Sequence, residues 1–353
     1  MDDVPAQGDP ADLHGAMIRR LHRRAIATGT ITIPAVPALL DDYVAMCEAT
    51  FAALGVHFTD EQVDRLREIL DGQLIQAYSA SPRSTIVITY ESPVGNVVNY
   101  HVKAEWSTVD DAYSTWLDTR EPPYFGTAPD ARVVALAEEA ADPSAFPILD
   151  VGAGTGRNAL ALARRGYPVD AIEMTPRFAD AIRDAAAEEG LAVRVFQRDM
   201  FEEVQGLRTD YQLMVLSEVV TDFRTTLDLR RTFELAASCL APGGRLVFNA
   251  FVCRGSFTPD DGARQFGQQA YSTVFTEAEL HEAASAFPMD LLSDVSVYEY
   301  EREHVPAEDW PPTSWYENWT QGLDVFDVPP EESPIEMRWR VYERRPEFSS
   351  GVT

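Results

Sequence analysis

Lysine is almost absent from this chain of 353 residues: of its 29 basic residues only Lys103 is a lysine, and the others are arginines. A P-loop requires a Gly-Lys pair, and an enzyme that uses pyridoxal phosphate requires a lysine for its Schiff base. Because Val102 precedes Lys103, the first class is excluded. In an enzyme that uses pyridoxal phosphate, only Lys103 could form the Schiff base.

Cysteine is also scarce, and the three cysteines (Cys47, Cys239 and Cys253) stand far apart without a CxxC pair. The six histidines include no HExxH pair. These patterns predict neither a disulfide framework nor a zinc site, so no metal ligand is assigned. A reducing, cytoplasmic setting fits this use of cysteine best.

Long apolar runs are missing as well, since no stretch approaches the ~20 consecutive apolar residues of a membrane-spanning helix. The opening Met1-Asp2-Asp3 is acidic, whereas a secretory signal begins with basic residues and continues with apolar ones. The 57 acidic residues outnumber the 29 basic ones, which gives a formal net charge of −28. Because polyanions are bound through basic surfaces, we expect no nucleic-acid partner and no membrane. The oligomeric state stays open.

The first third of the chain predicts a small separate lobe. Residues 1–34 form a poorly patterned leader, expected to be helical or poorly structured, and residues 35–125 form the lobe itself. An amphipathic helix ends at Gly55, and Thr59-Asp60-Glu61-Gln62 has the spacing of a capping box that starts a second helix. Two β-rich runs between residues 85 and 103 follow as a hairpin. We expect that these elements cannot bury one another alone, so that the lobe acts as a lid or binds substrate.

Residues 126–345 alternate between short apolar strands and helices, and residues 346–353 are a tail. Such alternation builds an open, mostly parallel, doubly wound sheet of the α/β class. The predicted strands cover residues 148–151, 168–173, 193–196, 213–216, 245–252, 295–300 and 337–342. The predicted helices cover residues 158–165, 177–189, 226–240 and a segment from residue 277. The last two strands alternate with period two, which favours an antiparallel edge.

A glycine-rich loop follows the first of these strands, in the segment Ile148-Leu149-Asp150-Val151-Gly152-Ala153-Gly154-Thr155-Gly156-Arg157-Asn158. This order of strand, loop and helix N-terminus lets a ligand approach the backbone closely. Arg157 stands where a dinucleotide-binding fingerprint has its third glycine. Asp150 would repel a pyrophosphate and suits a ligand with an ammonium or sulfonium group. The next strand ends at Glu173, whose carboxylate can accept hydrogen bonds from both hydroxyls of a ribose.

These residues resemble the S-adenosylmethionine-binding core of class I methyltransferases. The run GAGTGRNALALARRGYPVDAIE is most similar to small-molecule methyltransferases of the tellurite-resistance type. The resemblance covers about residues 147–300 and implies a seven-stranded sheet with S-adenosyl-L-methionine across its carboxyl edge. It also implies that Asp150 and the glycine loop flank the methionyl part, Glu173 holds the ribose, and Asp199 and Met200 lie at the adenine. The cofactor-binding residues that it implies are Asp150, Gly152, Ala153, Gly154, Gly156, Asn158, Glu173, Met174, Asp199, Met200 and Ser217.

The catalytic residues are less clearly marked. Glu218 follows the fourth strand, where the resembling family lines its active site, so it is a candidate for a base or for orienting the acceptor. His101 is a second candidate, because an imidazole titrates in the useful range. The alternative for Glu218 is a structural hydrogen bond, and the alternative for Asp199 is a role in a turn or a helix cap.

Aromatic residues supply the candidates for substrate binding, namely Tyr124, Trp315 and Trp319. The two tryptophans lie in residues 301–336, an acidic and aromatic segment that suits a cationic or neutral amphipathic substrate. The alternative is a solvated loop that its tryptophans anchor to the core.

The leading hypothesis is an S-adenosylmethionine-dependent methyltransferase that acts on a small molecule, such as a specialised metabolite or a short peptide. Catalysis is expected to depend mainly on positioning, because the methyl donor leaves as a neutral thioether and needs no acid. A protein or peptide methyltransferase and a non-catalytic cofactor-binding module are the alternatives. Asp150 and Arg157 disfavour a dehydrogenase.

Overall fold

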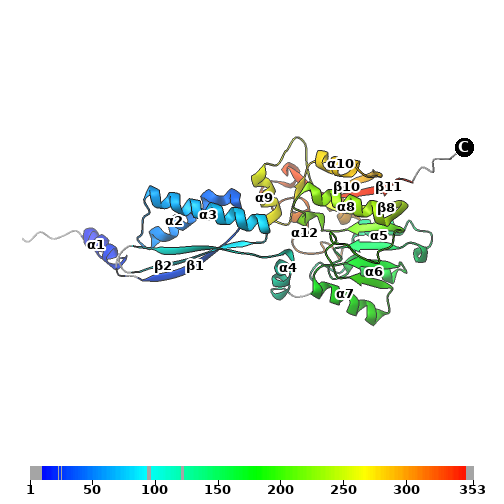
Figure 1. The fold of residues 1–353 in the computed structure, drawn as a ribbon, viewed down its shortest axis with the longest axis horizontal. Coiled ribbons are helices and arrows are strands. Elements are labelled where there is room, and N and C mark those ends of the chain that lie inside the picture. The colour runs from blue at the N-terminus through cyan, green and yellow to red at the C-terminus, as the bar shows by residue number, and fades with distance from the viewer. Residues whose placement is uncertain (1–9, 23, 25, 94–96, 121–122, 347–353) are drawn as a thin grey trace, which may run out of the picture. The chain divides into compact units, whose positions relative to one another are not determined.

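The chain divides into two units, residues 1–109 (unit 1) and residues 110–353 (unit 2), in the computed structural model (Figure 1). The structure describes residues 10–22, 24, 26–93, 97–120 and 123–346. The start of the predicted leader, the turn of the predicted hairpin and most of the predicted tail lie outside these ranges.

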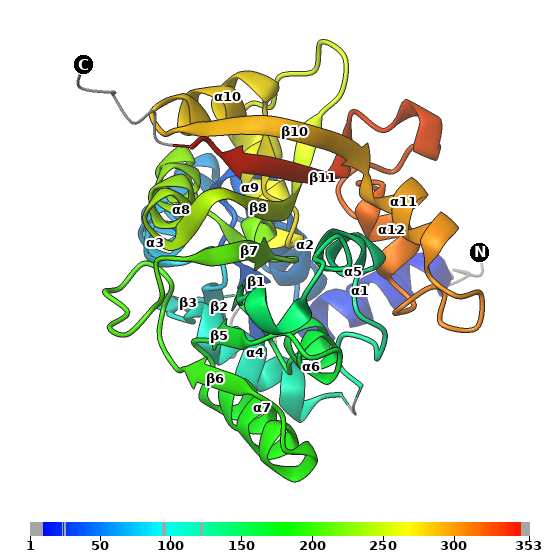
Figure 2. The same ribbon diagram turned by 90° about the vertical axis from the view of Figure 1, so that its right-hand side faces the viewer.

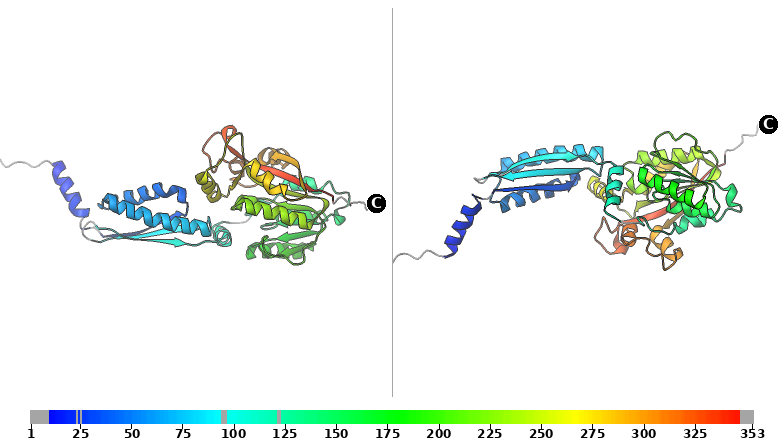
Figure 3. Two further views of the ribbon diagram at one scale, coloured as in Figure 1. Left: turned by 45° about the horizontal axis from the view of Figure 1, so that its top comes forward. Right: turned by 90° about the horizontal axis from the view of Figure 1, so that it is seen from below.

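Unit 1 is an antiparallel three-stranded sheet with two long helices on one face (Figure 3). Its elements are α1 (Pro10–His22), β1 (Ala27–Pro34), α2 (Leu40–Ala53), α3 (Asp60–Ala80), β2 (Thr85–Ser92) and β3 (Asn99–Glu105). The predicted helices and hairpin are confirmed, and so is the capping box, in which the Thr59 and Gln62 side chains each bond the other residue's backbone.

The predicted leader is wrong over residues 27–34, which form β1 and pair along their whole length with β2. This third strand explains a second correction. The sequence predicts a lobe that cannot bury its own helices and hairpin, yet Leu66, Leu70 and Leu74 of α3 are fully buried in a core that belongs to unit 1. A wider sheet gives both helices a surface to pack against. The strand β1 was missed because Thr and Gly dilute its apolar pattern.

Unit 2 holds the alternating segment. Its strands are β4 (Ile148–Val151), β5 (Val169–Ile172), β6 (Val193–Phe196), β7 (Tyr211–Leu216), β8 (Leu240–Cys253), β9 (Val274–Phe275), β10 (Met289–Ser296) and β11 (Ile335–Arg344). Its helices are α4 (Val109–Asp118), α5 (Ala131–Ala137), α6 (Arg157–Arg164), α7 (Pro176–Glu189), α8 (Thr226–Cys239), α9 (Asp261–Gln269), α10 (Glu277–Ser285), α11 (Val297–His304) and α12 (Tyr316–Thr320).

The main sheet has the order β10-β11-β8-β7-β4-β5-β6, and the short β9 pairs with β8. The strands from β6 to β8 are parallel, whereas β10 and β11 form the antiparallel edge that the sequence predicts. The chain starts at β4, runs outward to β6 and then returns to β7 beside β4. The strand order therefore reverses between β4 and β7, and ligands of such sheets bind at the carboxyl ends of the strands at this point.

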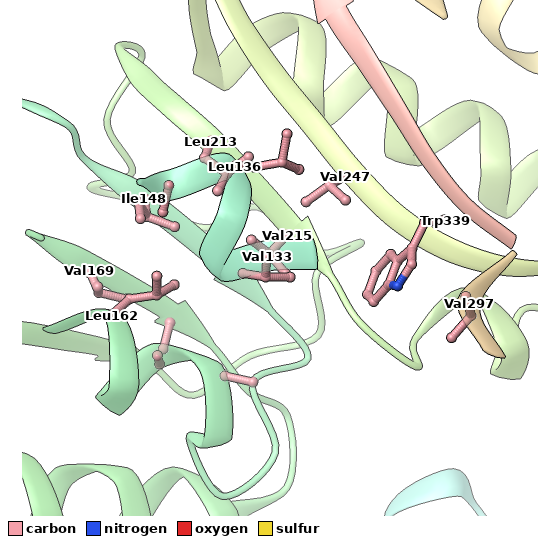
Figure 4. Packing of buried hydrophobic residues seen from close by; sticks show 14 of the residues in the cluster. Val133, Leu136, Ile148, Leu162, Val169, Leu213, Val215, Val247, Val297 and Trp339 are labelled. Carbon is pink, nitrogen blue, oxygen red and sulfur yellow. The ribbon is translucent and has the colours of Figure 1, made fainter. Parts of the chain in front are cut away.

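Helices cover both faces of the main sheet (Figure 2). Successive residues of β4 point to opposite faces, so Ile148 packs in a core with α5 and α6, and Leu149 in a second core with α8 and α10. Figure 4 shows the first core, in which Val133 of α5 and Leu162 of α6 meet side chains of the parallel strands. Both faces are thus apolar, which explains the near-continuous apolar runs of the parallel strands.

Two boundaries in unit 2 differ from those predicted from the sequence. The strand predicted at residues 295–300 is wrong after Ser296, because the side chain of Ser296 caps the N-terminus of α11 and ends β10. The predicted lobe boundary at residue 125 also lies too late. Residues 110–125 belong to unit 2, where Tyr113 and Phe125 pack against Phe178 of α7. Such contacts join distant segments, and the local pattern does not reveal them.

Candidate cofactor-binding and active site

The glycine loop begins where β4 ends, at the point where the strand order reverses. Gly152, Gly154 and Gly156 all have positive φ angles, of 66°, 56° and 88°. Gly152 lies directly against the loop that follows β7, because an added Cβ would stand 2.4 Å from Cγ2 of Val219. The N–H groups of the three glycines are hydrogen-bonded within the protein, to Ile172, Glu173 and Ala153, so the loop is held firmly beside the N-terminus of α6.

Asp150 is buried at the end of β4, with 2% of its surface exposed. Its carboxylate accepts a hydrogen bond from the backbone N–H of Ala159 in α6, but its Oδ2 atom has no partner among the described residues. Burial, followed by the nearby charge of Asp130, raises the pKa of Asp150 to about 7. A buried carboxylate with an unused oxygen fits a cationic ligand, as S-adenosylmethionine is, and the residues present therefore suit this group.

Glu173 lies after β5 and faces the glycine loop. Its Oε2 atom accepts a hydrogen bond of 2.8 Å from the Gly154 N–H, and its Oε1 atom accepts one of 2.7 Å from the Thr175 N–H. Burial raises the pKa of Glu173, and these backbone hydrogen bonds act in the opposite direction. Glu173 thus holds the loop in place through hydrogen bonds to residues on both of its sides. Met174 beside it is 41% exposed.

Asp199 and Met200 follow β6 at the same edge of the sheet. The Asp199 Oδ1 atom accepts a hydrogen bond of 2.8 Å from the Phe201 N–H, which is the turn role left open by the sequence. Met200 packs against the core beneath α8. This turn role leaves the other carboxylate oxygen of Asp199 available, so it does not exclude a contact with a ligand.

Asp130, which the sequence reading missed, is the most connected residue of the site. It is buried just before α5 and accepts hydrogen bonds from the Arg157 guanidinium (2.6 and 3.3 Å), the Asn158 amide (2.7 Å) and the Ser217 hydroxyl (2.7 Å). Asn158 and Ser217, which the sequence predicts to bind the cofactor, therefore donate hydrogen bonds to Asp130 instead. An aspartate before an apolar helix could have been found as a helix cap, but its partners could not.

Arg157 connects this group to Glu218. Its guanidinium donates a hydrogen bond of 2.9 Å to Glu218 Oε1, and the two side chains are only 9% and 16% exposed. Burial raises the pKa of Glu218 to about 7, Arg157 opposes this shift, and the charge of Asp130 adds to it. The backbone of Glu218 has a φ of 61°, a strained value for a residue other than glycine, and its N–H donates to Asn249 Oδ1 at 2.6 Å. Strain of this kind is often found at active sites.

Glu301 closes the buried group on the other side of α5. It accepts hydrogen bonds from the backbone N–H groups of Ala131 and Arg132 and from Trp339 Nε1, at 2.8, 3.1 and 2.9 Å. Burial raises its pKa to about 7. The sequence places Glu301 in the acidic and aromatic segment of residues 301–336, whereas here it holds the N-terminus of α5 and so fixes the position of Asp130.

The candidates for substrate binding separate in the structure. The Trp319 ring is buried and its Nε1 donates to the Tyr271 carbonyl at 3.1 Å, while the half-buried Trp315 packs against it at 5.2 Å between ring centroids. This favours the alternative in which the tryptophans anchor their segment. Tyr124 is half-buried in unit 2, and His101 is exposed on β3 of unit 1.

Comparison with known proteins agrees with this arrangement. Residues 148–244 match the sequence model of a family described as methyltransferase domain. These residues resemble a methyltransferase domain, and the chain is a methyltransferase. The match spans β4 to the start of β8, and therefore contains the glycine loop, Glu173 and Glu218.

Two curated proteins are similar to this methyltransferase. It is 24% identical over 173 residues to YodH of Bacillus subtilis (strain 168), an uncharacterized methyltransferase, and the match covers 49% of this chain and 72% of that protein. It is 33% identical over 101 residues to the ribosomal RNA small subunit methyltransferase C of Alcanivorax borkumensis, covering 28% of this chain and 30% of that protein.

Among solved structures, the geranyl diphosphate C-methyltransferase of Streptomyces coelicolor A3(2), in complex with Mg²⁺, geranyl diphosphate and S-adenosyl-L-homocysteine, is 15% identical. The TM-score is 0.48, and the match covers 61% of this chain and 80% of that one.

The predicted methyltransferase, its S-adenosyl-L-methionine cofactor and its mostly parallel α/β fold are confirmed. The finer resemblance to the tellurite-resistance type stays a prediction. In the described part of the chain, no helix is long and apolar enough to span a membrane. Within the same ranges, no group of three or more His, Cys, Asp or Glu side chains could hold a metal ion.

Replacement of Asp150 by asparagine is expected to weaken binding of S-adenosylmethionine about tenfold or more, because hydrogen bonds to charged groups contribute ~1.5–3 kcal/mol. In the wild type, a cationic ligand binds the ionised carboxylate, so affinity should rise with pH through about 7, where Asp150 loses its proton. Calorimetry between pH 6 and pH 8 should show this rise in the wild type and lose it in Asp150→Asn. Glu218→Gln is the control for the other carboxylate, and loss of the pH dependence there would point to Glu218 instead.

Replacement of Gly152 by alanine, compared with the same change at Gly190, separates the strain of a positive φ angle from the close approach of Val219. Gly190, at the end of α7, has nearly the same φ (67°) but no atom within 4 Å of an added Cβ, so Gly190→Ala should lose only ~1–2 kcal/mol of stability. Gly152→Ala adds an overlap with Val219 and should lose ~1–3 kcal/mol more. The measurement is the free energy of unfolding in denaturant. Adding Val219→Ala should restore part of the loss, and equal losses in Gly152→Ala and Gly190→Ala would show that the close approach is no constraint.

Proposed function

We propose that the protein transfers a methyl group from S-adenosylmethionine to a small-molecule acceptor, such as a specialised metabolite or a short peptide. One observation favours a small molecule as the acceptor. Glu218, the carboxylate beside the carboxyl end of β7, is only 16% exposed and is held from within by Arg157. A small molecule can reach such an enclosed group, whereas the folded surface of a protein cannot.

Different residues at the carboxyl edge of the sheet would bind different parts of the cofactor. Asp150 and the glycine loop would flank the methionyl end of the cofactor, Glu173 would hold its ribose, and Asp199 and Met200 would lie at its adenine. The cofactor supplies an electrophilic methyl group whose bonding electron pair returns to sulfur, so no side chain has to protonate the leaving group. The protein then has to place the acceptor ~3–3.5 Å from the methyl carbon and in line with the breaking bond, which supplies most of the acceleration.

Glu218 would orient the acceptor. Arg157 fixes the direction of its carboxylate, and Asn249 fixes its backbone. A carboxylate with a pKa of about 7 is also a competent base, but a base is required only when the acceptor must lose a proton during attack. Unit 1 would contribute to acceptor binding or to covering the site, as the sequence suggests.

Two other functions compete with this proposal. A protein or peptide methyltransferase would use unit 1 to dock a larger acceptor. A non-catalytic module would bind the cofactor without transferring its methyl group. The first is favoured only by the presence of a separate folded unit, and the second by no feature of the site.

Incubation of the protein with methyl-labelled S-adenosylmethionine and a metabolite extract distinguishes the three. A labelled small molecule supports the proposal, a labelled polypeptide supports the first alternative, and a bound but unused cofactor supports the second.

The same assay on a truncated protein of residues 110–353 tests the contribution of unit 1. If that unit binds acceptor or covers the site, cofactor affinity should remain while turnover is lost.

Once an acceptor is known, Glu218→Gln tests how far catalysis depends on positioning. The substitution keeps the shape of the side chain and removes its charge, so we expect kcat to fall less than about tenfold with cofactor affinity unchanged. Because Glu218 is ionised only above its pKa of about 7, the wild-type rate should rise modestly with pH through that value, and the variant should not follow. A loss beyond roughly a hundredfold would identify an obligate base and contradict the proposal of positioning.

A further inference from the structure

Helix α1 of unit 1 has an exposed apolar face. Every side chain from Ala11 to Leu21 is exposed, and none of these residues belongs to the core of unit 1. Leu13, Met17 and Leu21 follow one another at four-residue spacing and so lie on one face, where they are 65%, 57% and 59% exposed. A helix of 13 residues is only marginally stable in water without packing. The apolar face of α1 therefore calls for a partner.

The segment around α1 is basic, although the protein as a whole is acidic. Residues 10–26 contain a single acidic residue, Asp12, whereas the whole chain has a formal net charge of −28. The basic residues of this segment are Arg19, Arg20, Arg23 and Arg24. Because opposite charges attract across an interface, this segment favours a partner with an acidic surface.

The strand β1, which follows α1, is an edge strand without charged residues. In the described part of the chain it pairs only with β2, and β3 forms the other edge of the sheet. Proteins protect such edges with charged side chains, because the unpaired N–H and C=O groups invite another strand. The edge strand β3 has exposed His101, Lys103 and Glu105, whereas β1 has no charged residue and a proline only at its end. The edge of β1 is therefore open to pairing.

The helix α2, which begins shortly after β1, offers the acidic surface. Its first turn contains Asp41 and Asp42, both exposed. The exposed residues that follow on the same face are apolar and small or flexible, namely Ala45, Met46 and Ala49. Within one chain, Arg24 precedes β1 and these aspartates follow it, so the eight residues of the strand, ~27 Å when extended, separate the two charges. In an antiparallel pair of two β1 strands, the start of one strand would instead lie beside the end of the other.

We propose that two copies of the chain associate through unit 1. The β1 strands of the two copies pair antiparallel about a two-fold axis, and α1 of each copy packs its apolar face on α2 of the other. The arginines beside β1 then meet Asp41 and Asp42 of the second copy. Such an interface is self-complementary, because the same surface serves on both sides.

A second copy fits these features better than an anionic membrane does. A membrane would cover the apolar face of α1 and attract its arginines, but it would leave the edge of β1 unpaired. The net charge of −28 would also oppose the approach of the rest of the chain to an anionic surface. The second copy pairs the edge, covers the apolar face and supplies the acidic groups.

Sedimentation equilibrium of the full chain tests the proposal, and we expect a dimer. Thr30 is exposed near the middle of β1, so the two-fold axis brings it close to its own copy. Thr30→Lys and Thr30→Glu should both raise the dissociation constant about tenfold or more, because either charge then faces itself. Met17→Glu should do the same. Leu227→Glu on α8 is the matched control, since Leu227 is 59% exposed, and it should leave the dimer unchanged.

A charge exchange tests the contact between α1 and α2. Arg20→Glu and Asp42→Arg should each raise the dissociation constant severalfold, because each places two like charges together. The double variant restores an opposite pair and should recover part of the affinity. Both side chains are exposed, so circular dichroism and the unfolding midpoint should stay as in the wild type.

Three results would overturn the inference. The first is a monomer at every concentration, and binding of that monomer to phosphatidylserine vesicles would assign α1 to a membrane instead. The second is a dimer that withstands both Met17→Glu and the Thr30 variants, which would place the interface elsewhere. The third is an opposite effect of Thr30→Lys and Thr30→Glu, since a residue that faces its own copy cannot distinguish the sign of the charge.

Discussion

The buried ion pair between Asp130 and Arg157 is the interaction on which the geometry of the site depends. Asp130 precedes α5, Arg157 begins α6, and Ser217 and Glu218 follow β7, so one hydrogen-bonded group joins three elements at the point where the strand order reverses. Loss of one partner of a buried pair typically costs ~3–5 kcal/mol because the remaining charge is left uncompensated. The Asp130–Arg157 pair positions the site, because Arg157 sets the direction in which the Glu218 carboxylate points. Glu301 fixes Asp130 in turn by accepting hydrogen bonds from the first N–H groups of α5.

The charges of the site follow from the chemistry of methyl transfer from a sulfonium. A donor that arrives as a cation is stabilised by carboxylates that have few cationic partners of their own, and Asp150 with its unused oxygen is such a group. Burial of these acids raises their pKa values in the free protein, which opposes folding at neutral pH, since the ionised forms are less stable inside than in water. Ligand binding relieves that cost. The arrangement therefore favours binding over stability, as active sites commonly do.

Unit 1 stands apart from these arguments because it has a core of its own. Its sheet and the helices α2 and α3 bury Leu66, Leu70 and Leu74 without help from the main sheet. No packing requirement therefore obliges unit 1 to cover the site, and its contribution to the reaction is a matter of function alone. The aromatic ring that lies beside the glycine loop is that of Phe125, which belongs to unit 2.

The sequence by itself determined the features that depend on neighbours along the chain. The buried strand of Asp150, the glycine loop, the helix caps and the acidic end of β5 at Glu173 were all predicted, because period, turn chemistry and capping act over a few residues. The strand β1 and the extent of β10 were not predicted, because both mix apolar residues with polar ones. Only the tertiary structure decided that Arg157 pairs with Asp130, 27 residues away, and that Ser217 reaches the same carboxylate from 87 residues away. Such partners are chosen by the order of strands and the packing of helices, and these are properties of the whole sheet that no local pattern contains.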